Sequence, residues 1–236
     1  FRKRSHTRES LADLFWDGMP HKNARRCLST TLWRLKKEMP QGYSCLIVSD
    51  AGTVQFAHTN HQWVDILNFE EKAIDGLHMP LEQMCPEEGL LLEEAISLYR
   101  GDLLDGYYDE WVLRERERLH LLYLRSLSRL MRYYGGQNQL VKGIIYGQRL
   151  LAVDPLREQI HRELMQLHME RGERSLAIQQ YESCRYVLAD ELGIAPMQET
   201  QSLYKQLLSQ EACGETAVSP STHASTPTIA DKNDKE

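Results

Sequence analysis

A nearly unbroken helical pattern between residues 90 and 208 most constrains the fold of this chain. Apolar residues recur there at the spacing of one helix face, and glycine or proline interrupts the pattern where a helix would end. The segments marked in this way are Leu91–Tyr99, Glu110–Tyr134, Leu140–Val153, Pro155–Arg171, Arg174–Leu192 and Pro196–Leu208. The sequence therefore predicts a mainly α-helical fold.

Two of these helix pairs are copies of each other at a spacing of 34 residues. The shift superposes Leu130 on Leu164, Met131 on Met165, Asn138 on Gly172, Gly143 on Ala177 and Leu150 on Cys184. A helix-turn-helix unit of this length, with a small residue where its two helices touch, is typical of tetratricopeptide (TPR) repeats, which are binding scaffolds. We therefore predict a TPR-like helical domain within residues 60–209.

The stretch Asn23–Met39 predicts a second kind of helix, which is amphipathic and basic, with Asn23 as its N-cap. Its core-facing stripe would consist of Ala24, Leu28, Thr31, Leu32, Leu35 and Met39. Its opposite face would consist of Arg26, Thr30, Trp33 and Lys37, with Ser29, Arg34 and Lys36 at the edges of that face. Such a face suits the major groove of DNA, because Arg and Lys reach phosphates and guanine edges while Ser and Thr reach either kind of base. It equally suits the solvated side of an ordinary core helix.

The sequence on either side of this helix favours the DNA-binding interpretation. A short amphipathic helix, Ser10–Trp16, precedes it, joined by a turn at Asp17–Lys22. Two runs with strand composition, Cys45–Ser49 and Thr53–Ala57, follow it and flank a hairpin turn at Asp50–Gly52. This order predicts a winged helix-turn-helix over residues 1–59. Because the chain opens at Phe1 without an initiator Met, we expect this domain to be partial, with residues 2–8 as a cut strand or loop.

Charge is divided unevenly along the chain. Residues 1–40 carry ten Lys or Arg against four Asp or Glu, a balance of +6, which leaves eighteen against thirty, or −12, for the remainder. A basic head on an acidic body suits a DNA-contacting module attached to a domain that does not approach phosphate. The five cysteines include no C-x-x-C pair, so we expect reduced thiols. No apolar run reaches the length of a signal segment or a membrane span, so we expect a cytoplasmic location and no membrane contact.

We expect no enzyme activity, cofactor or metal, since the sequence has no phosphate-binding glycine loop, metalloprotease motif or nucleophile elbow. Three clusters of side chains allow a functional interpretation as well as a structural one. His161 and His168 share a helix face and would need Cys184 to hold a metal, so we predict that they pack between helices. Clustered carboxylates at Glu87, Glu88, Glu93 and Glu94 favour a helix N-terminus over acid–base catalysis. The aromatic cluster Tyr107, Tyr108 and Trp111 would line a ligand pocket or pack in the core, and we predict core packing.

Several strings in order resemble the SARP/AfsR-type bacterial regulators, in which a winged helix is fused to a bacterial transcriptional activator domain. They are SLYRGDLLDGYYDEW (Ser97–Trp111), LLAVDPLREQIHRELM (Leu150–Met165), AIQQYESCR (Ala177–Arg185) and LADELGIAP (Leu188–Pro196). The resemblance implies a transcription activator that binds promoter DNA as a homodimer and contacts RNA polymerase through its helical domain. The winged helix of this family also resembles response-regulator output domains of phosphorelays, although no phosphoacceptor receiver is present in this sequence.

Carried over by position, the resemblance places the recognition helix at Asn23–Met39 and the wing at Cys45–Ala57. The predicted DNA-contacting residues are Arg25, Arg26, Ser29, Thr30, Trp33, Arg34 and Lys37 of the helix, with Asp50 and Gly52 of the wing. Trp33 departs from the small polar residue more common there in the family. The alternative function is a TPR-type interaction or relay module of a larger regulator with an inactive winged helix. Residues 210–236, rich in Ser, Thr, Ala and Pro, are predicted to form a disordered tail or linker.

Overall fold

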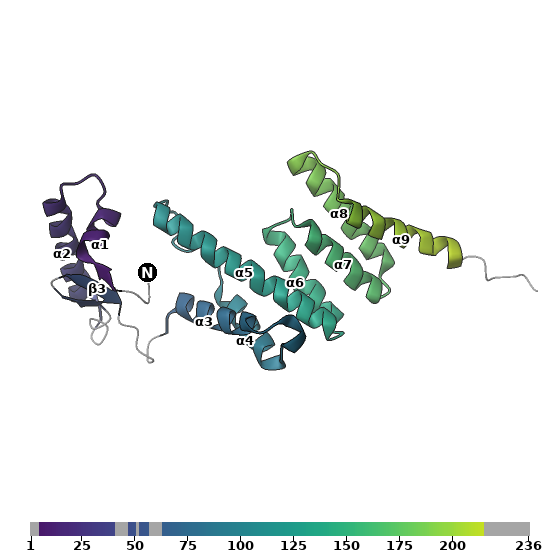
Figure 1. Cartoon of the computed structure of the whole chain (residues 1–236), viewed down its shortest axis with the longest axis horizontal. Coiled ribbons are helices and arrows are strands. Elements are labelled where there is room, and N and C mark those ends of the chain that lie inside the picture. Colours follow the sequence, from purple (N-terminus) through teal and green to yellow (C-terminus); the bar gives the residue numbers. More distant parts are fainter. Residues whose placement is uncertain (1–4, 41–46, 51, 57–62, 215–236) are drawn as a thin grey trace, which may run out of the picture. The chain divides into compact units, whose positions relative to one another are not determined.

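A computed structural model describes residues 5–40, 47–50, 52–56 and 63–214 of the chain. Its contacts divide the chain into two compact units, the first ending at Val64 and the second beginning at Asp65 (Figure 1). We call residues 1–64 the head and the second unit the helical domain.

The head combines two helices with a small antiparallel sheet. Its elements are β1 (His6–Thr7), α1 (Arg8–Phe15), α2 (His21–Glu38), β2 (Ile47–Ser49) and β3 (Thr53–Phe56). The strand order is β1-β3-β2, so that β3 pairs with both other strands, with His6 opposite Val54 and Ile47 opposite Phe56. β1 lies within residues 2–8, the stretch for which a strand or loop before the first helix was expected. A core of Ala12, Ala24, Leu28, Leu32 and Val54 lies between the helices and the sheet.

Local signals explain where the head helices begin. Thr7 caps α1 by accepting a hydrogen bond from the Ser10 backbone N–H at 3.1 Å. The predicted cap at Asn23 is wrong: α2 begins two residues earlier, at His21, after Pro20. The turn continues directly into the helix there, because the Pro20 carbonyl accepts the N–H groups of both Asn23 and Ala24. Asn23 is therefore inside the helix.

The buried stripe of α2 is narrower than predicted. Ala24, Leu28 and Leu32 are buried as expected, but Thr31 is exposed and Leu35 is 43% exposed. The core of the described head is small, and it covers only the central line of the helix. The edges of the predicted stripe consequently face away from that core.

The helical domain is built from helices in succession. They are α3 (Asp65–His78), the 3-10 turn η2 (Leu81–Gln83), α4 (Pro86–Leu98), α5 (Glu110–Gly136), α6 (Leu140–Val153), α7 (Glu158–Glu170), α8 (Arg174–Leu192) and α9 (Gln198–Gly214). The mainly α-helical fold is confirmed. No helix among the described residues is both long enough and apolar enough to span a membrane.

The first part of this domain departs from the sequence pattern. The segment from Asp65 to Glu88, which lies before the helical pattern of residues 90–208, already contains a complete helix, α3, and the start of α4. Gly76 lies at the contact between α3 and α4, where a Cβ would be only 2.6 Å from the Leu92 side chain. A glycine at this core position interrupts the apolar periodicity in the sequence. The two helices approach so closely that a glycine occupies a core position.

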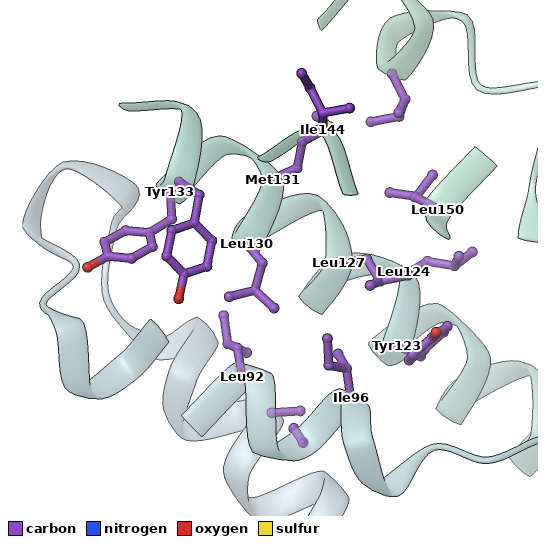
Figure 2. Packing of buried hydrophobic residues seen from close by; sticks show 14 of the residues in the cluster. Leu92, Ile96, Tyr123, Leu124, Leu127, Leu130, Met131, Tyr133, Ile144 and Leu150 are labelled. Atoms are coloured by element: carbon purple, nitrogen blue, oxygen red, sulfur yellow. The ribbon is translucent and has the colours of Figure 1, made fainter. Parts of the chain in front are cut away.

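The core of the helical domain runs along both sides of α5. Figure 2 shows Leu92 and Ile96 of α4 beneath Leu130 and Leu127 of α5, and the same cluster continues on the other side of α5 to Leu150 of α6. In Figure 1, helices α5 to α8 follow one another as antiparallel pairs. The α5 and α7 helices are joined by a two-pronged ion pair between the Arg132 guanidinium and the Glu163 carboxylate, at 2.7 and 2.9 Å.

Residues that the 34-residue shift superposes have matching environments in the structure. Leu130, Leu164, Met131 and Met165 are all at most 1% exposed, as are Leu150, Ala177 and Cys184. The equivalent turn residues Asn138 and Gly172 both adopt left-handed backbone angles, with φ of 58° and 74°. Gly143 lies against the neighbouring helix, where a Cβ would meet the Met131 carbonyl oxygen at 3.0 Å. The TPR-like architecture is thus confirmed.

The last helix is longer than predicted. α9 continues to Gly214, five residues into the segment 210–236 that composition assigned to a tail. The rest of that predicted tail, residues 215–236, lies outside the described residues, as does part of the first predicted wing strand, residues 45 and 46.

Candidate functional site

The exposed face of α2 carries cations that no acidic group of the described head neutralises. Arg26, Arg34 and Lys37 are exposed, and no carboxylate among the described residues pairs with any of them. Trp33 lies among them with 60% of its surface exposed. The Lys37 ammonium lies 5.0 Å from the centre of the Trp33 ring, within the range of a cation–π interaction. The structure thus brings these four predicted residues onto one solvent-facing surface.

Arg25, Ser29 and Thr30 have partners within the head. The Arg25 guanidinium forms an ion pair with Glu9 of α1 at 3.0 Å. The hydroxyls of Ser29 and Thr30 donate to carbonyl oxygens one turn earlier in α2, at 2.9 and 3.0 Å. These hydroxyls keep acceptor lone pairs, but their donors are used. DNA contacts by these three residues stay predictions.

Arg8 was not among the predicted site residues, yet it belongs to the same surface. Its guanidinium donates to the Ser29 hydroxyl oxygen at 2.7 Å, which places a cation from the start of α1 beside α2. Its backbone N–H donates to the Gly52 carbonyl at 2.9 Å, linking α1 to the hairpin. A single-sequence pattern holds no signal for this contact, because it joins positions 21 residues apart on two different helices.

The hairpin turn is organised by Asp50. Its carboxylate accepts the backbone N–H groups of Gly52, at 2.9 Å, and Thr53, at 2.5 Å. These two bonds, that of Thr53 first, lower the pKa of Asp50 below its ordinary value of 3.8. The carboxylate is therefore ionised and engaged in the turn. The DNA contacts predicted for Asp50 and Gly52 remain untested, and the geometry assigns Asp50 a structural role in shaping the hairpin.

A surface groove of about 580 Å³ lies beside the exposed cations, at the junction of α1 and α2. Its lining consists of Trp16, Met19, Asn23, Arg26, Cys27, Thr30, Thr31 and Arg34. Most of these residues are polar or charged, and two of them are cations of the exposed face. The groove therefore continues the basic face of α2.

The histidines of the helical domain are packed as predicted. His161 is 4% exposed; its Nε2 lies 2.9 Å from the Pro155 carbonyl oxygen, and its Nδ1 lies 2.6 Å from the Gln180 side-chain amide. These partners fix a neutral ring that donates from Nε2 and accepts at Nδ1. Burial lowers the pKa of His161 from 6.5. Over the described residues, no group of three or more His, Cys, Asp or Glu side chains is placed to hold a metal ion.

The clustered glutamates have structural partners. Glu88 accepts the Cys85 backbone N–H at 2.6 Å, which confirms its role at a helix N-terminus. Glu93 accepts hydrogen bonds from the hydroxyls of Tyr134 and Tyr146, both at 2.7 Å, and Glu94 pairs with Lys72. These contacts join α4 to its neighbouring helices.

Core packing was the wrong prediction for two of the three clustered aromatics. Tyr107 is 60% and Tyr108 is 76% exposed, whereas Trp111 is half-buried. The loop before α5 turns outward at Gly106, whose φ of 85° lies in the left-handed region, and this carries both tyrosines away from the core.

Fold and surface together define a helical-repeat protein with a basic helix on a separate small unit. Residues 64–208, more than half of the chain, match the model of the bacterial transcriptional activator domain, and the chain belongs to this family. This confirms the family resemblance over the helical domain.

Named relatives extend the similarity to the head. The chain is 27% identical to "Regulatory protein AfsR" of Streptomyces coelicolor over 207 residues, covering 87% of this chain and 20% of that protein. It is 23% identical to "Transcriptional regulatory protein MoaR1" of Mycobacterium tuberculosis, covering 86% of this chain and 66% of that protein. The chain thus spans about a fifth of AfsR and just under two thirds of MoaR1.

A solved structure has the same fold. Mycobacterium tuberculosis EmbR, determined in complex with a low-affinity phosphopeptide, superposes with a TM-score of 0.70 at 20% identity. The match covers 89% of this chain and 56% of that one.

Proposed function

We propose that this chain is a transcriptional regulator that binds promoter DNA through the head, with α2 as the recognition helix of a winged helix-turn-helix and the β2–β3 hairpin as its wing. The observation that carries the proposal is the exposed face of α2, where Arg26, Arg34 and Lys37 stand without an acidic partner among the described residues. Membership of the bacterial transcriptional activator domain family and the names of the two relatives support it.

The contacts within the head assign different parts to the cations. Arg26, Arg34 and Lys37 would contact phosphates and base edges, and Trp33 would offer an apolar surface to a thymine methyl group. Arg25, held by Glu9, and Arg8, held by Ser29, would orient the helix and contact the backbone. The hairpin shaped by Asp50 would approach the neighbouring groove or backbone.

The helical domain would supply protein contacts. TPR-like arrays are binding scaffolds, and the proposed partners are a second copy of the chain on DNA and RNA polymerase, which makes the regulator an activator working in the cytoplasm. No enzyme activity is proposed, because the glutamates and His161 are committed to structural hydrogen bonds.

Fluorescence anisotropy with labelled duplex DNA across a salt series tests the head. A selection from random-sequence DNA by the purified chain supplies the specific duplex. Arg26→Ala should cost about 1–3 kcal/mol of binding if the side chain reads a base, whereas Lys37→Ala should lower the salt slope by about one. Arg114→Ala is the matched control, because its exposed guanidinium lies on α5 of the helical domain.

Unchanged affinity in both head variants, with circular dichroism showing a folded protein, would reject α2 as the DNA-binding element. A folded chain that binds no DNA at any salt concentration would favour the alternative function, a TPR-type interaction or relay module with an inactive winged helix.

A further inference from the structure

The loop between α4 and α5 presents a cluster of large side chains to solvent. Tyr107 and Tyr108 are 60% and 76% exposed, and Leu104 and Leu113, which lie near them in the sequence, are more than two fifths exposed. Neighbouring tyrosines with this exposure contribute little to the stability of the domain that carries them. We call these four residues the tyrosine patch.

Arg116 holds the backbone of the loop at Leu103, Leu104 and Tyr107. This guanidinium, on α5, donates to the carbonyl oxygens of Leu103, at 3.0 and 3.1 Å, Leu104, at 2.9 Å, and Tyr107, at 3.3 Å. Only 15% of the Arg116 side chain is exposed, so water competes weakly for these bonds. Leu104 adopts a left-handed φ of 50°, a conformation that a non-glycine residue keeps only when its surroundings fix it.

The surroundings of the tyrosine patch are acidic. Carboxylates occur at Asp102, Asp105, Asp109 and Glu110. Asp102 pairs with Arg116 at 3.7 Å and Glu110 with Arg114 at 3.2 Å, which leaves Asp105 and Asp109 as the carboxylates that carry the negative charge beside the tyrosines. The side chain of Asp102 is 49% exposed and that of Glu110 is 84% exposed. A negative rim around aromatic rings attracts cations and repels nucleic acid.

We propose that the tyrosine patch is a docking surface for a cationic protein segment, one that carries lysine or arginine beside an apolar side chain. Exposed tyrosines on a preorganised loop are typical hot spots of interfaces, because little conformational entropy is lost when they are covered. The acidic rim disfavours a second copy bound through the same patch, since a two-fold contact would bring the carboxylates of both copies together. The surface lies in the helical domain and does not depend on DNA binding by the head.

Anisotropy with two labelled amphipathic helical peptides tests the proposal on the full chain. One peptide consists of leucine and lysine, and the other has glutamate at every lysine position. The lysine peptide should bind the wild type and lose affinity about tenfold or more in the Tyr107→Ser/Tyr108→Ser variant. Tyr107→Phe/Tyr108→Phe should restore most of the affinity, because the ring surface returns.

Two further variants distinguish binding at the tyrosine patch from non-specific attraction between the lysine peptide and an acidic protein. Tyr186→Ser, at a tyrosine on α8 with 68% exposure, should bind the lysine peptide as the wild type does. Arg116→Ala keeps both tyrosines but frees the loop, and should weaken binding. Circular dichroism melting of each variant confirms that the domain remains folded.

Equal binding of the lysine peptide to the wild type and the double serine variant would overturn the proposal, as would binding of the glutamate peptide with similar affinity. A concentration-dependent dimer in sedimentation velocity that the double serine variant abolishes would identify a second copy as the occupant and would also overturn it. DNA affinity is measured separately, so failure here leaves the proposed function of the head unchanged.

Discussion

The head and the helical domain bury their apolar side chains to different extents. The described head has a core of five buried residues, three of them on α2, and leaves Phe15, Met19, Trp33 and Leu35 between 43% and 60% exposed. The helical domain buries an extended cluster in which Leu92, Leu127 and Leu130 lose all contact with water. Burial of apolar area is the main source of stability. The apolar side chains that stay exposed on the head contribute little to its stability, so we expect the head to be the less stable unit.

The largest effect that follows from this difference concerns a core leucine of the repeats. Leu164→Ala removes a fully buried side chain between helices and should cost about 2–5 kcal/mol of unfolding free energy. Urea denaturation followed by far-UV circular dichroism measures it. Leu176→Ala, at a leucine that is 41% exposed, is the control and should change stability little.

The same truncation in the head distinguishes the two cores. Leu28→Ala should unfold the small core of the head, and with it abolish the DNA binding proposed for the head, while leaving the main helical transition in place, since Leu28 belongs to a separate cluster. An equal shift of the helical transition by Leu28→Ala would show that the two cores unfold together, and the comparison would be wrong.

A smaller effect is expected at the contact between paired helices. Gly143→Val places methyl groups against the Met131 carbonyl oxygen and should cost about 1–3 kcal/mol, because backbone must move. Gly136→Ala is the matched variant: a Cβ there meets no described atom within 4 Å, and it should stabilise the end of α5 by up to about 1 kcal/mol. Thermal melting of both variants checks the sign. Equal destabilisation would contradict the packing of α5 against α6.

The half-buried carboxylate of Glu93 gives a more modest effect. Glu93→Gln keeps an oxygen that can accept from Tyr134 and Tyr146 but removes the charge that strengthens both bonds, so it should cost about 1 kcal/mol. Denaturant titration measures the loss. Glu94→Gln, at the exposed neighbour, should cost less.

The smallest effect is a pH dependence from His161. Burial lowers its pKa in the folded protein below 6.5, so the unfolded chain takes up the proton first as pH falls. Stability from this group is therefore complete above about pH 6.5 and is lost as pH falls toward the lowered value. His161→Gln should reduce the drop in melting temperature between about pH 7.5 and about pH 5.5. An unchanged drop would assign the acid sensitivity to other groups.

The repeats could be predicted from the sequence because their signals are local and doubled. The 34-residue spacing by itself locates Gly143, Ala177 and the left-handed turn positions Asn138 and Gly172. The full extent of α3 is harder to predict, because its packing against α4 depends on Gly76, a residue that a periodicity search counts as a break.

The exposure of the candidate site residues could be predicted from the sequence, but their side-chain partners could not. The basic face of α2 follows from helical geometry, and Trp33, Arg26, Arg34 and Lys37 are all exposed. The bonds from Arg8 to Ser29 and from Arg25 to Glu9 depend on how α1 crosses α2, which no local pattern encodes. The backbone of the loop at Tyr107 is likewise fixed by Arg116, a residue of the following helix.

The length of α5 affects how the helical domain opens to hydrogen exchange. At 27 residues this helix extends about 40 Å, and it contributes core residues both to the packing with α4 and to the packing with α6 (Figure 2). The amides near its middle cannot be released by fraying of either neighbour alone. Hydrogen exchange there should report the global unfolding of the helical domain, whereas the two ends of α5 exchange through separate, less costly openings. Through α5, the helix pair α3–α4 and the TPR-like repeats become a single cooperative unit.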